Sequence, residues 1–236
     1  MIRITDFHTH VLPRIDDGSS SVEESILMLQ KAAEQGIERV IATPHFYAQS
    51  DTPERFLARR QEAENRLREA MEKYSDLPEL LVGAEVYFFR GISDSDILHR
   101  LTIAEKGCIL IEMPQAPWTE RMLGELEGIW RKQGLWPILA HVDRYLAPFK
   151  TRGIMKQLER IPVSVQANAE FFLQKSTRKT AMRLLREDRI HLLGSDCHNL
   201  RSRVPNLGDA LRLICDQFDE EMVARINWYG QDLLGE

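Results

Sequence analysis

Histidine and carboxylate side chains recur in this chain where apolar, strand-like runs end. His8 and His10 stand two residues apart near the N-terminus, and Asp196 and His198 repeat that spacing near the C-terminus. Residues i and i+2 of a strand project to the same face, so each pair can bind one ion. The candidate ligands are His8, His10, Asp17, His45, Glu85, Glu112, His141, Asp196 and His198. So many ligating side chains exceed what a structural core needs and predict a hydrolytic site with several metal ions.

Two of these candidates are glutamates that end apolar runs. Glu85 follows residues 80–84, and Glu112 follows residues 108–111. A buried carboxylate without a partner costs several kcal/mol, and metal coordination removes that penalty. Mixed imidazole and carboxylate ligands suit Zn²⁺, Mn²⁺ or Fe²⁺. Two or three such ions would bind phosphate oxygens and activate a water, which predicts metal-assisted hydrolysis of a phosphate ester.

Apolar, β-prone runs that alternate with helical patterns must position these side chains. Strands are expected at 2–7, 38–43, 80–85, 108–112, 136–141, 162–167 and 190–194. Helices are expected from 22 to about 35 and at 53–74, 119–132, 151–160, 176–187, 206–217 and 219–228. Continuous apolar runs are typical of strands buried on both faces of a parallel sheet. The pattern predicts one domain, residues 1–236, with an α/β fold: a distorted (β/α)7 barrel with its site at the C-terminal strand ends.

The start of the first expected helix has a sequence signature of its own. Ser21 and Glu24 resemble a capping box, in which the serine hydroxyl accepts from the Glu24 amide and the glutamate reaches back to the Ser21 amide. Gly36 follows the last apolar turn and is expected to end the helix.

Composition excludes several classes of protein. The net charge of −5 argues against a general nucleic-acid surface. Three cysteines form no disulfide framework, which suits a reducing compartment. No apolar stretch is long enough to span a membrane, so we expect a cytoplasmic protein without membrane insertion. The oligomeric state stays open.

Several motifs together carry a family resemblance that covers nearly the whole chain. They are Asp6-Phe7-His8-Thr9-His10-Val11-Leu12-Pro13, Asp16-Asp17-Gly18-Ser19, Glu23-Glu24-Ser25, Ala42-Thr43-Pro44-His45, Gly83-Ala84-Glu85, His141-Val142-Asp143-Arg144-Tyr145 and Gly194-Ser195-Asp196-Cys197-His198-Asn199. The chain resembles the polymerase and histidinol phosphatase (PHP) family. Asp17 and Glu112 make it most similar to the bacterial manganese-dependent protein-tyrosine phosphatases of capsule and exopolysaccharide synthesis.

The resemblance implies three metal sites and a phosphate clamp. The three ligand sets are His8, His10, Glu85 and Asp196; Glu85, Glu112 and His141; and Asp17, His45 and His198. Glu85 would bridge the first two ions. Manganese is the expected metal, with iron or zinc as alternatives. Arg144 and Arg203 would bind the phosphate, because a guanidinium fork can hold two oxygens. Arg201 is an equally available alternative to Arg203.

The implied reaction is attack on phosphorus by a metal-bridging hydroxide. The implied substrate is phosphotyrosine in a flexible protein tail, and the implied partner is a bacterial tyrosine autokinase of polysaccharide synthesis. Two departures from the family pattern leave substrate preference open: Val142-Asp143 follows His141, and Phe46-Tyr47 follows His45. Water, Asp143 or a histidine could protonate the leaving group.

Three alternatives remain at this point. The first is a small phosphomonoester, such as histidinol phosphate, as the substrate. The second is a cysteine mechanism, because Cys197 and Arg203 have the C-x5-R spacing; this stretch lacks a glycine for a tight anion-binding loop. The third is a barrel in which metal ions have only a structural role.

Overall fold

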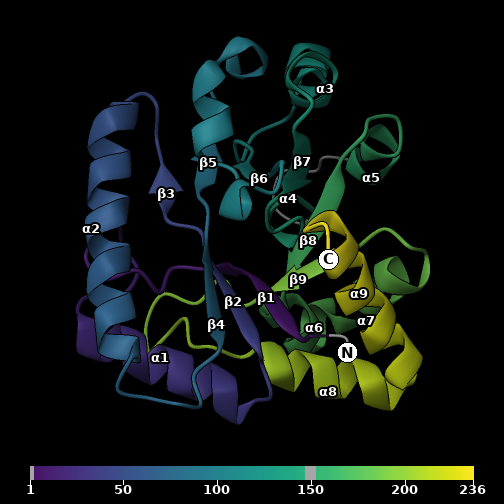
Figure 1. Cartoon of the computed structure of the whole chain (residues 1–236). Helices are drawn as coiled ribbons and strands as arrows, with labels where there is room; N and C mark the ends of the chain where they lie inside the picture. The colour runs from purple at the N-terminus through teal and green to yellow at the C-terminus, as the bar shows by residue number, and fades with distance from the viewer. Residues whose placement is uncertain (1–2, 147–152) are drawn as a thin grey trace.

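Parallel strands form a curled sheet with helices around it (Figure 1). The computed structural model describes residues 3–146 and 153–236. Its strands are β1 (Thr5–Thr9), β2 (Arg39–Ala42), β3 (His45–Phe46), β4 (Glu79–Val82), β5 (Glu85–Tyr87), β6 (Cys108–Glu112), β7 (Trp136–Leu139), β8 (Ser164–Asn168) and β9 (Leu192–Gly194). Each expected strand has a counterpart here, so the parallel α/β architecture is confirmed.

The helices connect successive strands and cover the outside of the sheet. They are α1 (Val22–Glu34), α2 (Pro53–Met71), α3 (Glu120–Gln133), α4 (Asp143–Leu146), α5 (Ile154–Leu158), α6 (Ala169–Leu173), α7 (Lys175–Arg186), α8 (Leu207–Gln217) and α9 (Glu220–Leu233). Three short 3₁₀ turns, which the sequence did not predict, are η1 (Ile92–Asp94), η2 (Asp96–Arg100) and η3 (Ile103–Glu105). Residues 151 and 152 of the helix expected at 151–160 lie outside the described residues, as does residue 2 of the first strand.

The strands follow one another in two hydrogen-bonded series. One series has the order β1-β2-β4, and the other has the order β3-β5-β6-β7-β8-β9. The two ends meet where β1 approaches β9: His10 N donates to Cys197 O at 2.9 Å, and Asp196 N donates to His8 O at 2.7 Å. This meeting places the two ligand pairs from opposite ends of the chain side by side.

Two neighbouring strands are interrupted at the same level. Arg39 lies opposite Glu79 in the β2–β4 pair, and His45 lies opposite Glu85 in the β3–β5 pair. Gly83 N donates to Ala42 O at 2.8 Å and Glu85 N donates to Pro44 O at 3.0 Å, so the two chains stay paired across this gap. The ladder lacks the bond that Pro44, which has no N–H, cannot donate. At the gap, a Cβ atom on Gly83 would lie only 2.9 Å from Ile103 of η3, so the glycine allows this close approach.

The first helix begins as expected, but its capping glutamate bonds one residue earlier. Ser21 Oγ accepts from Glu24 N at 3.2 Å. The Glu24 carboxylate instead accepts from Ser20 N at 2.8 Å and from Ser20 Oγ at 2.6 Å. The return bond to Ser21 N was thus a wrong prediction, because Ser20 offers the carboxylate two donors at once.

Apolar side chains fill the interior of the curled sheet. Phe7, Ile41, Cys108, Leu110, Ile138, Ala140 and Leu192 form this cluster, together with Ile103 and Leu234. A larger apolar core lies between the strands and the surrounding helices. Because the interior is packed, the polar ligands can converge only at the strand ends.

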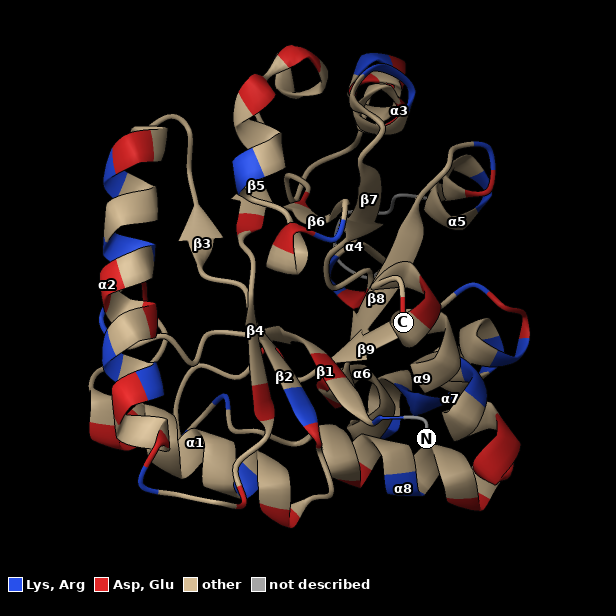
Figure 2. Cartoon of the chain, viewed as in Figure 1, with Lys and Arg blue, Asp and Glu red and all other residues tan. Residues whose placement is uncertain are grey.

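The helical surface carries both signs of charge. Figure 2 shows basic and acidic residues interspersed along α2, where Arg66 pairs with Glu62 and Arg68 pairs with Glu64. This agrees with the long, charged, exposed helix expected there. In residues 3–146 and 153–236, every helix is too short or too polar to cross a membrane.

Candidate metal centre

Four ligand atoms converge from β1, β5 and the segment after β9. His8 Nε2 lies 3.1 Å from Glu85 Oε2 and 3.5 Å from Asp196 Oδ1, and His10 Nε2 lies 3.3 and 3.5 Å from the same two oxygens. The two imidazole nitrogens are 3.1 Å apart. A tetrahedral ion with bonds of about 2.0–2.1 Å requires ligand atoms about 3.4 Å apart. His8, His10 and Glu85 therefore have the spacing of one metal site. Asp196 contacts both histidines, and the four side chains are hereafter the buried cluster.

Glu85 also faces a second group of ligands. His141 Nε2 lies 2.7 Å from Glu85 Oε1 and 3.7 Å from Glu112 Oε1. His45 Nδ1 lies 3.0 Å from Glu85 Oε2 and 3.9 Å from Glu112 Oε2. Glu85 thus contacts ligands of two neighbouring sites, as a bridging carboxylate would.

A third group, hereafter the entrance cluster, lies nearer to solvent and contains Asp17, His45 and His198. His45 Nε2 and His198 Nε2 lie 3.5 and 3.4 Å from Asp17 Oδ1. The Asp17 side chain is 67% exposed, so the polar centre opens to solvent here. His45 contributes Nδ1 to the second group and Nε2 to this one, a double role that its sequence position did not reveal.

Several buried atoms at these sites have no hydrogen-bond partner in the described part of the chain. They are His45 Nδ1, Glu85 Oε2, Glu112 Oε2 and His198 Nε2. A buried polar atom without a partner costs about 1–3 kcal/mol. Divalent ions would give each of these atoms a partner, so the residues present fit metal ions.

The electrostatics of the carboxylates favour cations too. Burial alone would raise the pKa of Glu85 and Asp196, but His8 and the other basic groups nearby hold both well below their usual range. Both are therefore anionic, the form that binds metal. Burial and the adjacent Glu85 raise the pKa of Glu112, and a bound cation would relieve that repulsion.

Asp16 is a supporting residue that the sequence analysis named only within the motif Asp16-Asp17-Gly18-Ser19 and not as a site residue. Its Oδ2 accepts from His10 Nδ1 at 2.8 Å and from His45 N at 3.0 Å, and its Oδ1 accepts from Gly18 N at 2.9 Å. Burial opposes ionisation, but the hydrogen bond from His10 lowers the Asp16 pKa to about 2. An anion on Nδ1 leaves Nε2 of His10 for a metal. The sequence signal for such a supporting role was the position of Asp16 directly before Asp17 and Gly18.

A chain of amides holds the opposite side of the buried cluster. Gln166 Oε1 accepts from His141 N at 2.6 Å and lies 3.3 Å from His8 Nδ1. Gln166 Nε2 donates to Asn168 Oδ1 at 3.1 Å, and Asn168 Nδ2 donates to Asp196 Oδ2 at 2.9 Å. These bonds let the end of β8 orient His8 and Asp196.

The backbone at two ligands is unusual. His141 has a φ of 31° and Asp196 a φ of 54°. Such conformations cost non-glycine residues about 1–3 kcal/mol and persist where the surroundings impose them. Close packing adds a further constraint, because a Cβ on Gly194 would lie 2.5 Å from His8 Cβ. Both observations show that the surrounding packing constrains the backbone at these two ligands.

Two arginines reach the same centre from α4 and from the loop before α8. Arg144 Nη2 donates to Asp196 Oδ2. Arg203 Nη2 donates to Asp196 Oδ1 at 2.6 Å, and its Nη1 lies 4.0 Å from Asp17 Oδ2. Both line a cavity of about 350 Å³, whereas the alternative, Arg201, is exposed and lies outside that lining.

Comparison with known proteins agrees with this geometry. The family model for capsular polysaccharide synthesis proteins of the CpsB/CapC type matches residues 4–233. The chain belongs to this family. The expected resemblance to capsule-related phosphatases of the PHP type is thereby confirmed.

Individual members of the family are distant in sequence. The chain is 28% identical over 232 residues to the tyrosine-protein phosphatase CpsB of Streptococcus agalactiae, covering 92% of this chain and 91% of the relative. It is 28% identical over 226 residues to the tyrosine-protein phosphatase YwqE of Bacillus subtilis, covering 92% and 86%. A solved structure from work on YwqE and Streptococcus pneumoniae CpsB, described as unique metal-dependent tyrosine phosphatases, superposes with a TM-score of 0.83 at 24% identity. It covers 98% of this chain and 94% of the solved one, which shows a common fold.

The cysteine mechanism finds no support in this geometry. Cys197 is buried, and burial together with Asp6 and Asp196 raises the pKa of its thiol. A nucleophilic cysteine needs the opposite, a lowered pKa and access to substrate. Arg203, the second residue of the C-x5-R spacing, binds Asp196.

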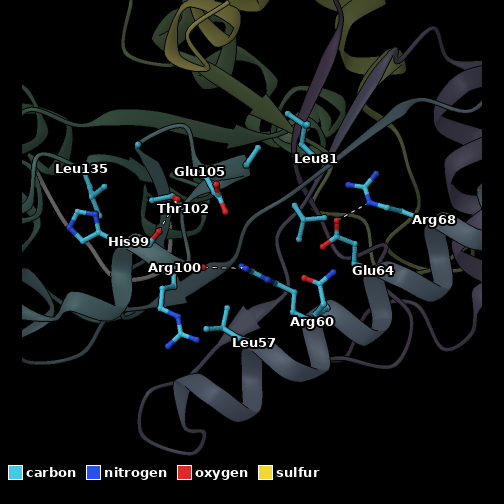
Figure 3. Close-up of a pocket in the computed structure, with 14 residues that line it drawn as sticks. Leu57, Arg60, Glu64, Arg68, Leu81, His99, Arg100, Thr102, Glu105 and Leu135 are labelled. Atoms are coloured by element: carbon cyan, nitrogen blue, oxygen red, sulfur yellow. Dashed lines mark hydrogen bonds and ion pairs between the residues drawn. The ribbon is translucent and has the colours of Figure 1, made fainter.

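A cavity of about 730 Å³ lies away from this centre. Figure 3 shows Arg60, Glu64 and Arg68 of α2 along it, with Thr102 and Glu105 also lining it. Arg60 donates to Gly83 O at 2.9 Å and to Arg100 O at 3.2 Å, and so ties α2 to η2. The cavity contains none of the candidate ligands. Its size therefore does not identify the active site.

Proposed function

We propose that this protein is a metal-dependent phosphomonoesterase, and specifically a protein-tyrosine phosphatase. The observation that carries the proposal is the convergence of His8, His10 and Glu85 at metal-ligand spacing, with Asp196 against both histidines and Glu85 shared by a second ligand group. Family membership supports the choice of reaction, since related proteins are named tyrosine-protein phosphatases.

We assign three metal sites to the ligand groups. The assigned sets are His8, His10, Glu85 and Asp196; Glu85, Glu112 and His141; and Asp17, His45 and His198. His10 also adjoins the last set, and His45 adjoins the second. Manganese is the preferred metal, and iron or zinc would suit the same imidazole and carboxylate ligands. Bound divalent ions would supply positive charge for phosphate oxygens and a water that ionises near neutral pH.

Arg144 and Arg203 bind the phosphoryl group in this proposal. Their guanidinium groups approach the Asp196 carboxylate from two elements, so both already reach the centre. A phosphate offers the same acceptor geometry as a carboxylate, and a guanidinium can donate to two of its oxygens. Negative charge grows on the phosphoryl oxygens in the transition state, and the two guanidinium groups stabilise that charge.

The full fold assignment is part of the proposal. If β2 with β3 and β4 with β5 each count as one interrupted strand, the pairings describe seven strands that close between β1 and β9. That arrangement corresponds to a distorted (β/α)7 barrel, formed as one domain by residues 1–236.

The proposed substrate is phosphotyrosine in a flexible tail of a bacterial tyrosine autokinase of polysaccharide synthesis. A flexible segment can reach a recessed site, which a folded surface cannot do without rearrangement. The described cysteines are free thiols, as expected for a protein that works in the cytoplasm.

The deciding experiment measures hydrolysis of p-nitrophenyl phosphate by metal-stripped protein before and after addition of Mn²⁺, Fe²⁺ or Zn²⁺. We expect no hydrolysis without metal, recovery on addition, and renewed loss with chelator. Failure of every metal to restore hydrolysis would contradict the proposal. A second assay compares a phosphotyrosine peptide with histidinol phosphate. Preference for histidinol phosphate would favour the small-substrate alternative.

A further inference from the structure

A cavity of about 410 Å³ adjoins the entrance cluster. Asp17, His45 and Tyr47 line it beside the metal centre, and Arg55 and Arg59 line it from α2. The cavity therefore extends from the candidate metal ligands to a basic region of α2. No residue of this outer part belongs to the proposed metal sites or phosphate clamp.

Tyr47 presents an aromatic ring at the inner part of this cavity. The ring lies 5.3 Å from the His45 ring and 5.6 Å from the Tyr87 ring, between centroids. The preceding Phe46 is buried and packs 5.1 Å from Phe56 of α2, which fixes the end of β3. Tyr47 nevertheless remains 38% exposed. A held but accessible aromatic ring, next to a metal ligand, is suited to contact an aromatic group of a substrate.

The outer part of the cavity, lined by Asp51, Arg55 and Arg59, holds one more positive charge than negative, whereas Asp16 and Asp17 line the inner part. Arg59 Nη2 lies 2.8 Å from Asp51 Oδ2, and Arg55 Nε lies 3.9 Å from Asp51 Oδ1. One carboxylate thus faces two guanidinium groups. The remaining positive charge suits an anionic group on a ligand, and guanidinium binds both carboxylate and phosphate.

We propose that this cavity is the leaving-group subsite. The aryl ring of the substrate packs against Tyr47, and a second anionic group of the same substrate chain, a carboxylate or a phosphate, pairs with Arg55 and Arg59. Tyr47 is then a specificity-determining residue for aryl over alkyl phosphates. This inference rests on the proposed phosphatase function and deepens it.

The aromatic contact is tested by the ratio of kcat/KM for phosphotyrosine to kcat/KM for phosphoserine. Tyr47→Leu should lower this ratio roughly fivefold, because an aromatic pair contributes beyond simple burial. Tyr47→Phe should keep the ratio, since the ring makes the contact. The matched control is Tyr74→Leu, whose side chain is similarly exposed at 41% but follows α2, away from the cavity. It should change neither rate.

The anionic contact is tested with three phosphotyrosine peptides, which carry a neutral flank, a glutamate flank or a second phosphotyrosine. We expect the wild-type protein to favour at least one anionic peptide over the neutral one by roughly fivefold in KM, and Arg59→Ala to remove that preference. The peptide that is favoured identifies the anion. Arg66→Ala is the control, because Arg66 lies on the same helix, pairs with Glu62 and does not line the cavity. Its KM values should match the wild type.

The outcomes separate the inference from the function on which it rests. A wild-type protein without hydrolysis of any phosphate ester would overturn the proposed function and this inference with it. An active wild type whose aryl-to-alkyl ratio survives Tyr47→Leu would overturn the aromatic contact alone. Equal KM values for all three peptides would overturn the anionic contact. Matching thermal unfolding curves for the variants would show that misfolding does not explain the losses.

Discussion

The buried and entrance clusters differ in how the fold holds them. Side chains of the buried cluster, His8, His10, Glu85 and Asp196, are 0–3% exposed and come from paired strands or the residues next to them. Asp17 of the entrance cluster is 67% exposed and comes from the loop between β1 and α1. Strands set ligand spacing during folding, whereas a loop leaves more freedom. An ion in the buried cluster should therefore bind more tightly and exchange more slowly than one at the entrance.

Hydrogen bonds hold the loop that carries Asp17. Ser19 N donates to His10 O at 3.0 Å, and Arg14 N donates to Ser19 O at 2.8 Å. A Cβ on Gly18 would collide with His10 O at 2.3 Å, so the loop can approach β1 only with glycine there. Turn geometry thus positions Asp17, whose contact with solvent distinguishes it from the buried cluster. His45 and His198 come from β3 and the segment after β9 and are 11% and 1% exposed.

Loss of the shared carboxylate should have the largest effect. Glu85→Ala should reduce kcat on the order of 10³-fold or more, because each bound ion is worth several kcal/mol of transition-state stabilisation. Elemental analysis should show fewer bound ions per protein. Near-native activity of this variant would remove Glu85 from the site. Glu72→Ala, at an exposed position after α2, is the control.

The arginine that touches both clusters comes next. Arg203→Ala should lower kcat/KM roughly 10–100-fold, because a charged hydrogen bond contributes about 1.5–3 kcal/mol. Metal content should stay unchanged. Arg201→Ala should remain within about twofold of the wild type, since surface changes have small effects. The reverse pattern would mean that the loop places Arg201 on the phosphate.

Removal of the exposed ligand should cost less than removal of the buried one. Asp17→Ala should lower activity about 30-fold, because an exposed charge interacts more weakly than a buried one. Titration with Mn²⁺ should show one weakened site and others of unchanged affinity. Equal losses for Asp17→Ala and Glu85→Ala would break the distinction between the clusters.

Removal of the Asp16 charge, which contacts Nδ1 of His10, should have a smaller effect than the loss of a ligand. Asp16→Asn keeps the shape but removes the anion that orients the imidazole, so metal affinity should fall about tenfold. The measurement is metal affinity by competition with a fluorescent chelator. A variant with unchanged affinity would show that the side-chain amide positions His10 equally well.

Thiol alkylation should have almost no effect. Burial raises the pKa of Cys108 to about 12, and burial raises that of Cys197 as well, so neither forms thiolate near neutral pH. Mass spectrometry after iodoacetamide should find label on the partly exposed Cys215 in the folded protein, with activity retained. Inactivation that follows labelling of Cys197 would revive the cysteine mechanism.

The sequence predicted the buried cluster better than its surroundings. His8 and His10 share one face because alternate residues of a strand point to the same side. The ends of parallel strands lie at one edge of the sheet, so the other ligands are expected to converge there. Asp16 was missed because an Asp-Asp-Gly turn has the same signature whether or not its carboxylate supports a ligand. The double contact of His45 depends on ring orientation, which packing decides.

The interruptions of two strands were also missed, for a different reason. Pro44 has no N–H to donate, so the ladder loses a bond at this level, while the bonds from Gly83 N to Ala42 O and from Glu85 N to Pro44 O keep the two chains paired. Periodicity records which side chains are buried, and the loss of one ladder bond leaves that unchanged. The close approach of Ile103 to Gly83 is a tertiary contact with no local signal.

The matched interruption restricts how this chain can change in length during evolution. From Arg39 opposite Glu79 to Phe46 opposite Val86, the partners remain forty positions apart on both sides of the gap. A one-residue deletion in either strand alone would turn His45 or Glu85 toward the wrong face. Insertions and deletions in these two strands must therefore occur as compensating pairs, while the turn between α2 and β4 can lengthen without affecting the centre.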